Sequence, residues 1–308
     1  MSILVVVSVA LDSVKTPFGR VTEALGGSAS YFSLAASYFT DVNLVAVVGE
    51  DFPLEHVESM KKRGIDLTGL QRLPGKTFRW EGEYGYDLNE AMTLSTCLNV
   101  FESFRPEIPD NYKDLPYVFL ANIDPELQLD VLKQVRDPEL VAMDTMNFWI
   151  EKKPDALHEV LRHVNILIIN EAEARQFTKE YHIHLAARRL LSWGPWALVI
   201  KRGSYGALLF TSTSMFAAPA YIVNRVFDPT GAGDSFAGGF MGYLANTHNT
   251  TEAAIRQAII FGSVMASFNC ENFSVHRLST LTYKEIEHRF REFRQLTTFD
   301  DLTEMVWR

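Results

Sequence analysis

Short apolar runs alternate with amphipathic stretches along most of the chain. The runs are rich in β-branched residues and too short for helices, so each predicts a buried β-strand. The predicted strands are Ile3–Ala10, Asn43–Val48, Tyr117–Ala121, Val141–Asp144, Ile166–Asn170, Ala197–Lys201 and Ala207–Thr211. The predicted helices between them are Ser28–Phe39, Pro53–Arg63, Pro125–Val135, Pro154–His163 and Glu171–Phe177. This alternation predicts an α/β fold with a mostly parallel central sheet and helices on both faces.

One segment has a different pattern. Residues 77–86, TFRWEGEYGY, alternate between aromatic and polar side chains, which predicts a two-faced antiparallel strand. We place this strand in a small β lid formed by segments near residues 12–20 and 76–100, paired with residues 88–98 or with residues near 14–20. The side chains expected on its aromatic face are Phe78, Trp80, Tyr84 and Tyr86. That face either packs onto the body or onto a second copy, which would make a homodimer through the lid, or it lines a ligand site.

Composition narrows the class of protein. The chain has 308 residues, of which 47% are apolar and 22% charged, as in a folded globular protein without a linker, and we expect one domain over residues 1–308. A net charge of −9 argues against a nucleic-acid partner or an anionic membrane surface. No apolar run approaches the ~20 residues of a membrane span. The two cysteines, Cys97 and Cys270, are far apart, so a reducing cytoplasm is the simplest location.

The strongest chemical signal is the sequence DPTGAGDSFAGGF at residues 228–240. Gly231 and Gly233 allow a tight turn, and Ser235 begins a helical stretch of small residues. A glycine turn that enters a helix presents free N–H groups and the positive end of the helix dipole, which favour a phosphate. Asp234 would repel a bound phosphate, so acceptance of a proton from an attacking hydroxyl explains this carboxylate better than helix capping alone.

This segment resembles the C-terminal signature of the ribokinase (PfkB) family of sugar and nucleoside kinases. Other segments match the family in the expected order, namely Asp12 with the pair Gly26-Gly27, VVGEDFP at 47–53, NEAE at 170–173 and KRGSYG at 201–206. The resemblance covers most of the chain. It implies a ribokinase-like three-layer sandwich with a small β lid, and an ATP-dependent kinase.

The resemblance also implies roles for individual residues. Asp234 would be the general base, and the turn Gly231-Ala232-Gly233 would stabilise the transferring phosphate. The implied ATP-binding residues are Asn170, Lys201, Gly203, Gly206, Gly231 and Gly233. Glu173 would position Mg²⁺ through water, whereas Asp228 and Thr230 match a monovalent-cation site, usually potassium. From the residues alone, Asn170 and Glu173 also fit a generic solvent-facing Asn and Glu at a helix start, and the glycines at 203 and 206 also fit a hairpin turn.

The acceptor is a small molecule, and the implied contacts with it are Asp12, Gly26, Gly27, Tyr31, Phe78 and Trp80. Tyr31 stands where the family commonly has Asn. Its flat ring and the aromatic lid favour a planar base, because stacking contributes ~1–3 kcal/mol per base. We therefore expect an ATP- and Mg²⁺-dependent kinase that phosphorylates a primary hydroxyl of a nucleoside. A sugar kinase of the ribose or fructose type is the alternative, and a non-catalytic nucleotide- or sugar-binding protein is a third hypothesis.

Overall fold

The structure is a computed structural model that describes residues 1–298, and its main feature is a nine-stranded sheet. The strand order is β13-β12-β11-β10-β9-β8-β1-β4-β5, in which β12 and β13 form an antiparallel edge on an otherwise parallel sheet. The strands are β1 (Ile3–Val6), β4 (Val42–Gly49), β5 (Ile65–Leu73), β8 (Tyr117–Leu120), β9 (Leu140–Met143), β10 (Ile166–Asn170), β11 (Ala197–Lys201), β12 (Ala207–Thr211) and β13 (Met215–Ala218).

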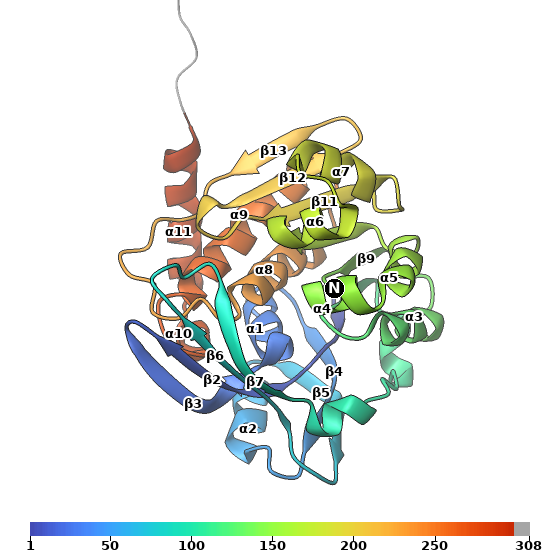
Figure 1. The fold of residues 1–308 in the computed structure, drawn as a ribbon, viewed down its shortest axis with the longest axis vertical. Coiled ribbons are helices and arrows are strands. Elements are labelled where there is room, and N and C mark those ends of the chain that lie inside the picture. The colour runs from blue at the N-terminus through green and yellow to red at the C-terminus, as the bar shows by residue number, and fades with distance from the viewer. Residues whose placement is uncertain (299–308) are drawn as a thin grey trace, which may run out of the picture.

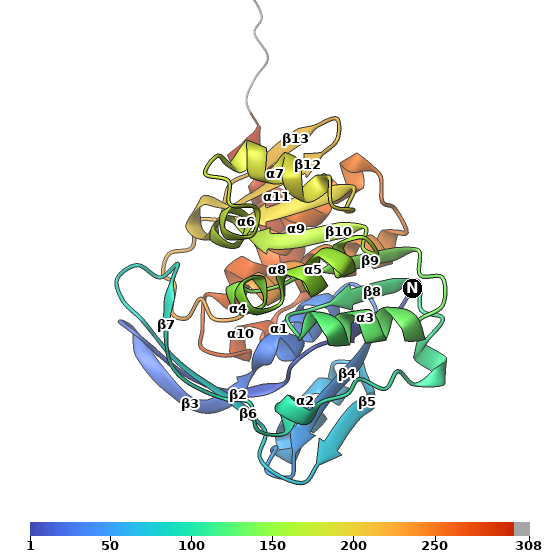
Figure 2. The ribbon, with the colours of Figure 1, turned by 45° about the vertical axis from the view of Figure 1, so that its right-hand side comes forward.

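Each face of this sheet carries its own hydrophobic core. In β1, Ile3 and Val5 belong to one core and Leu4 and Val6 to the other, because successive side chains of a strand point to opposite faces. Figures 1 and 2 show α1, α8 and α9 on one side of the sheet and α3 to α7 on the other. The helices are α1 (Gly27–Ala36), α2 (Leu54–Lys62), α3 (Pro125–Gln134), α4 (Asn147–Lys152), α5 (Pro154–Leu161), α6 (Glu171–Thr178), α7 (Ile183–Leu191), α8 (Ala232–Thr247), α9 (Glu252–Asn269), α10 (His276–Thr280) and α11 (Tyr283–Thr297). The predicted three-layer α/β architecture is confirmed.

The first predicted strand, Ile3–Ala10, is divided between two sheets. β1 ends at Val6, and the next strand begins only at Ala10, in a separate sheet. Val7 and Val9 are fully buried between these strands, so the apolar run is continuous although the strand is not. An apolar run alone does not distinguish a long strand from a short strand followed by a buried crossing.

The second sheet is a curved lid of four strands in the order β3-β2-β6-β7, which lies beside the large sheet (Figure 1). The strands are β2 (Ala10–Thr16), β3 (Gly19–Gly26), β6 (Phe78–Tyr84) and β7 (Ala91–Cys97). Both partners considered for the alternating segment are present, because β6 pairs parallel with β2 and antiparallel with β7. The prediction for Tyr86 was wrong, since β6 ends at Tyr84 and the Tyr86 side chain is fully exposed beyond it.

Short 3₁₀ turns occur in the connections between the main elements. They are η1 (Asn99–Ser103), η2 (Asp110–Tyr112) and η3 (Gly203–Tyr205). Within residues 1–298, no helix has the combination of length and apolar character that crossing a membrane requires.

Glycines allow α8 to start deep in the molecule, against α1. A Cβ atom on Gly238 would lie 2.3 Å from the carbonyl oxygen of Phe32, so a larger residue would push the two helices apart. At the start of α8, Gly231 has a φ of 76°, and a Cβ atom there would lie 2.2 Å from the ring of Tyr31. Since Tyr31 is only 1% exposed, its ring has little room to move away. The tyrosine ring thus fixes the position of the turn that precedes α8.

The substitution Gly231→Ala tests this packing, and Gly64→Ala is its matched control. Gly64 has the same φ of 76° but no atom within 4 Å of an added Cβ, so the control measures the left-handed backbone alone, at about 1 kcal/mol. We expect G231A to lower the free energy of unfolding by roughly 2–4 kcal/mol, because the collision with Tyr31 adds to the backbone cost. Urea unfolding measures both losses.

A second substitution separates the collision from other causes. In a Tyr31→Ala background, the further loss caused by G231A should be smaller than in the unaltered protein, since the ring that the new methyl group meets is gone. Equal losses for G231A and G64A would show that the tyrosine ring does not constrain the turn.

Candidate active site

Three neighbouring parallel strands carry polar side chains at one edge of the large sheet. Asp144 follows β9, Asn170 ends β10 and Lys201 ends β11. Because the carboxyl ends of parallel strands meet at the same edge, these side chains lie together at the edge where open α/β sheets usually bind ligands. The site is therefore placed where α/β sheets generally bind ligands.

The turn that leads into α8 lies beside this edge and is the predicted anion site. Gly231 is the N-cap, and no side chain caps the helix. The N–H of Ala232 donates to the Pro229 carbonyl at 3.0 Å. Gly233 and Asp234 occupy the next two positions, whose N–H groups have no partner within a helix. With the positive end of the helix dipole, these groups favour a bound phosphate.

Two buried carboxyl groups flank this turn. Burial and the charge of Asp144 raise the pKa of Asp234 to about 6, although Lys201 opposes the shift. Burial also raises the pKa of Asp12 to about 7. The N–H of Gly27, which donates to Asp12 Oδ2 at 3.1 Å, has the opposite effect on this pKa but is outweighed. The charge of Asp234 contributes to the raised pKa of Asp12, so the two carboxyl groups lie in one site.

Lys201 supplies a positive charge among these carboxylates. Its Nζ donates to Asp144 Oδ2 at 2.9 Å. Burial lowers the pKa of Lys201, but Asp144, Glu173 and Asp234 outweigh this effect and hold the pKa above its usual value. The sequence analysis assigned no role to Asp144, although its place at the end of a predicted strand was a signal that could have found it.

Asn170 and Glu173 form a reciprocal capping box at the start of α6. Asn170 Oδ1 accepts the Glu173 N–H at 2.7 Å, and Glu173 Oε2 accepts the Asn170 N–H at 3.0 Å. Burial raises the pKa of Glu173 to about 7, and the charge of Asp144 adds to the shift. The two residues therefore cap the helix rather than simply facing solvent, and the cap occupies only one of the two carboxylate oxygens of Glu173.

Gly203 and Gly206 form the turn that joins β11 to the antiparallel strand β12, as the hairpin alternative predicted. The Gly206 N–H donates to the Gly203 carbonyl at 3.1 Å. The lid reaches this turn, because Asn89, between β6 and β7, accepts the N–H of Ser204 at 3.0 Å. The lid thus contacts the segment whose sequence resembles the family's nucleotide-binding turn.

Lid side chains also contact the anion turn. Thr230 Oγ1 donates to the hydroxyl of Tyr84 in β6 at 3.3 Å, and Thr16 Oγ1 in β2 donates to the Phe227 carbonyl at 2.8 Å. The sequence analysis placed Tyr84 on the aromatic face, and the structure brings it to the turn that precedes α8.

The other two predicted lid contacts point elsewhere. The ring of Phe78 stacks on Phe101 with centroids 5.4 Å apart, so it packs on the body, which is one of the alternatives left open. Trp80 donates its Nε1–H to Thr93 Oγ1 at 3.2 Å and lines a groove along the lid sheet with Leu94. The structure does not bring Phe78 together with the buried carboxylates, and a homodimer through the lid stays a prediction.

The loop after α9 holds the anion turn from the opposite side. Asn269 Nδ2 donates to the Thr230 carbonyl at 2.7 Å. Asp228 accepts the N–H of Thr230 at 2.9 Å and the N–H of Ser274 at 3.2 Å. Within the described part of the chain, Asn269 Oδ1 is buried without a hydrogen-bond partner. Oxygen atoms of Asp228, Thr230 and Asn269 therefore gather beside the turn.

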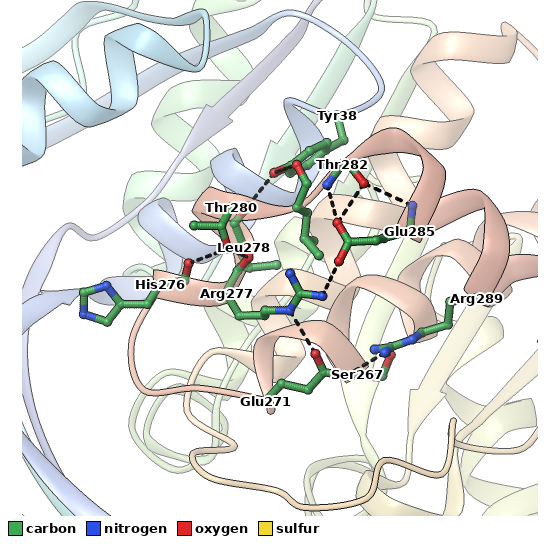
Figure 3. Close-up of polar contacts among 11 residues, drawn as sticks. Tyr38, Ser267, Glu271, His276, Arg277, Leu278, Thr280, Thr282, Glu285 and Arg289 are labelled. Atoms are coloured by element: carbon green, nitrogen blue, oxygen red, sulfur yellow. Dashed lines mark hydrogen bonds and ion pairs between the residues drawn. The ribbon is translucent and has the colours of Figure 1, made fainter.

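Ion pairs brace this loop, as Figure 3 shows. Arg277 contacts Glu271 at 2.9 Å and Glu285 at 2.7 Å, and Arg289 contacts Glu271 at 2.6 Å. These pairs join the loop to α10 and α11. The sequence analysis missed the contacts of Asn269 and Ser274 because their sequence positions carry no motif.

Comparisons with known proteins agree with this geometry. Residues 4–280 match the pfkB family of carbohydrate kinases. A cytidine kinase of Thermococcus kodakarensis is 32% identical over 247 residues, which are 78% of this chain and 87% of that protein. The structure is similar to a nucleoside kinase of Methanocaldococcus jannaschii, with a TM-score of 0.75 and 21% identity over 94% of this chain and 98% of that one. It is also similar to a ribokinase of Thermotoga maritima, with a TM-score of 0.74 and 22% identity over 94% and 99%. Because the family match spans residues 4–280 and the cytidine kinase is similar over most of the chain, this chain is a kinase and belongs to the PfkB family.

Proposed function

We propose that this kinase transfers the γ-phosphate of ATP to a primary hydroxyl of a nucleoside. The observation that carries the proposal is the position of Asp234, a half-buried carboxylate at the start of α8, where no side chain of residues 1–298 caps the helix. A phosphate at this helix end and a hydroxyl beside Asp234 would be close enough to react. The 32% identity to a cytidine kinase supports a nucleoside as the acceptor.

The chemistry follows from these two features. Asp234 takes the proton of the acceptor hydroxyl, and the turn Gly231-Ala232-Gly233 stabilises charge on the transferring phosphoryl group through the N–H of Gly233 and the helix dipole, because the N–H of Ala232 is bonded to the Pro229 carbonyl. Phosphoryl transfer depends mainly on alignment and charge neutralisation, which fixed N–H groups provide without rearrangement. A pKa of about 6 leaves Asp234 mostly ionised at neutral pH yet still a competent base.

The acceptor is held by Asp12, the Gly26-Gly27 turn and Tyr31. The hydroxyl of Tyr31 is buried without a partner among the described residues, close to Asp12, Asp228 and Asp234, and burial together with these charges raises its pKa. Since buried polar groups nearly always have partners, an unpartnered hydroxyl supports a contact with a ligand. Trp80 would extend this site only if the lid groove faces the acceptor.

Mg²⁺ would be held near Glu173 through water. Asp144, Glu173 and Asp234 are three carboxylates around the single ammonium of Lys201, so the site favours a further cation. When bound, Mg²⁺ neutralises the charge of the ATP phosphates. Asn170 would contact the phosphates from the start of α6, and the backbone of Gly203 and Gly206 would contact the rest of the nucleotide.

A monovalent cation, most simply K⁺, would bind beside Asp228, which is 1% exposed. The nearby carbonyl of Thr230 and the unpartnered Oδ1 of Asn269 are oxygen donors that suit such an ion.

We expect KCl to raise the thermal unfolding midpoint by roughly 2–5 °C relative to choline chloride at the same ionic strength. Asp228→Asn should abolish the difference. Equal midpoints in both salts for the unaltered protein would argue against the cation site.

A panel of acceptors tests the choice of substrate. ADP release would be measured with MgATP and with cytidine, inosine, adenosine, ribose or fructose as the acceptor. We expect turnover of at least one nucleoside to exceed turnover of the sugars by ~10²-fold or more. Polar groups that form hydrogen bonds with the base would be left without partners when the acceptor is a sugar, which has no base. Turnover of a sugar without turnover of nucleosides would favour the ribose- or fructose-type alternative. No turnover with any acceptor would favour a binding protein.

Asp234→Asn tests the general base. We expect kcat to fall ~10²–10⁴-fold while the affinity for ATP changes little, because the amide cannot accept the proton. In the unaltered protein, kcat/KM should fall as the pH drops below the interval of about 6 to 7, since protonation of Asp234 and Asp12 removes their acceptor function. A flat profile from pH 5 to 8, or near-normal turnover of D234N, would remove Asp234 from this role.

A further inference from the structure

Lys201 lies against the anion turn. A Cβ atom placed on Gly233 would be 3.1 Å from Lys201 Nζ, so the ammonium group lies beside the second residue of α8. The unpaired N–H groups at the start of the helix and the ammonium are therefore neighbours. Both are donors to anions, and together they favour a phosphate oxygen more strongly than either alone.

The ammonium is only partly satisfied by protein atoms. Among residues 1–298, its hydrogen-bond partner is Asp144 Oδ2 at 2.9 Å. An ammonium group has three N–H donors, so two are left for other partners. The Lys201 side chain is 19% exposed and that of Asp144 is 7% exposed, which leaves an opening on the lysine side of the pair.

Asp144 determines where this charge lies. In the described part of the chain, the positive charge of Lys201 lowers the pKa of both Asp234 and Glu173, against the effect of burial. Without Asp144, the flexible lysine would be drawn to Asp234 and would make that carboxylate a weaker proton acceptor. The pair with Asp144 keeps the ammonium at Gly233 instead.

We propose that Lys201 is a catalytic residue that binds the γ-phosphoryl group of ATP, and that Asp144 is a positioning residue that holds the Lys201 ammonium beside Gly233. This inference rests on the proposed ATP-dependent transfer and adds a group to it. During the transfer, the acceptor oxygen bonds to the γ-phosphorus as the bond to the bridging oxygen of ADP breaks. The acceptor proton goes to Asp234, whereas the ammonium keeps its protons and neutralises charge on the phosphoryl oxygens.

Nucleotide binding tests the contact with the γ-phosphoryl group. The affinities of Lys201→Met for MgADP and for a non-hydrolysable ATP analogue with an imido bridge would be measured by calorimetry without an acceptor. We expect the affinity for the analogue to fall ~10–100-fold and that for ADP no more than ~3-fold, as for one lost charged hydrogen bond. Lys153→Met is the matched control, because Lys153 contacts Asp124 and Glu126 at 2.7 Å, outside the site. That variant should change neither affinity.

Turnover tests the role of Asp144. We expect K201M to lower kcat ~10²–10³-fold and Asp144→Asn to lower it ~10-fold. In the K201M background, D144N should lower kcat by less than ~2-fold more, because Asp144 acts through the lysine. Two independent effects that multiply in the double variant would show that Asp144 has no positioning role.

The double variant K201M/D144N also distinguishes loss of the contact with the phosphoryl group from loss of affinity caused by misfolding. Each single substitution leaves a buried charge without its partner, whereas the double variant removes both charges and should have a thermal unfolding midpoint close to that of the unaltered protein. It should still lose affinity for the analogue and not for ADP. Equal losses for both nucleotides, or no loss, would overturn the proposal while the kinase function stands. If the unaltered protein bound neither nucleotide, the proposed function and this inference would both fail.

Discussion

The arrangement of this protein depends on one constraint, namely that the half-buried start of α8 has no side-chain cap among residues 1–298. A helix end without caps is unfavourable unless a ligand takes the place of the cap. The turn before it is held from three directions, by the ring of Tyr31, by Asn269 and by Tyr84 of the lid. These contacts hold the backbone in position, and the Gly233 N–H, without a partner in the described part of the chain, can donate to an anion.

The same region concentrates charges that a protein core normally avoids. The pKa values of Asp12, Glu173 and Asp234 are raised chiefly because burial removes these carboxyl groups from water. One ammonium, that of Lys201, lies among them and does not balance their charge. Such a cluster lowers stability in the absence of ligands, which is common where a site is prepared for a reaction. Bound cations and phosphate groups would complete the balance of charges.

The lid connects the two halves of the site. Its β2 and β6 strands contact the anion turn through Thr16 and Tyr84, and the connection between β6 and β7 contacts the turn of residues 203–206 through Asn89. Closure over both ends is suited to a kinase, because water must be kept from a reactive phosphoryl group. The lid aromatics therefore have different tasks, since Phe78 packs on the body while Tyr84 contacts the turn.

The sequence by itself determined the features that depend on neighbours a few residues apart. Strands β10 to β12 have their predicted bounds, and the motif at residues 228–240 located the glycine turn and Asp234 at the start of α8. Only the tertiary structure decided which distant side chains meet. Asp144 and Lys201 are 57 positions apart, and Asn269 and Thr230 are 39 apart, so no local pattern records their contacts. The physical reason is that periodicity and turn chemistry act over one or two turns of chain, whereas the order of strands in the sheet determines which strand ends become neighbours.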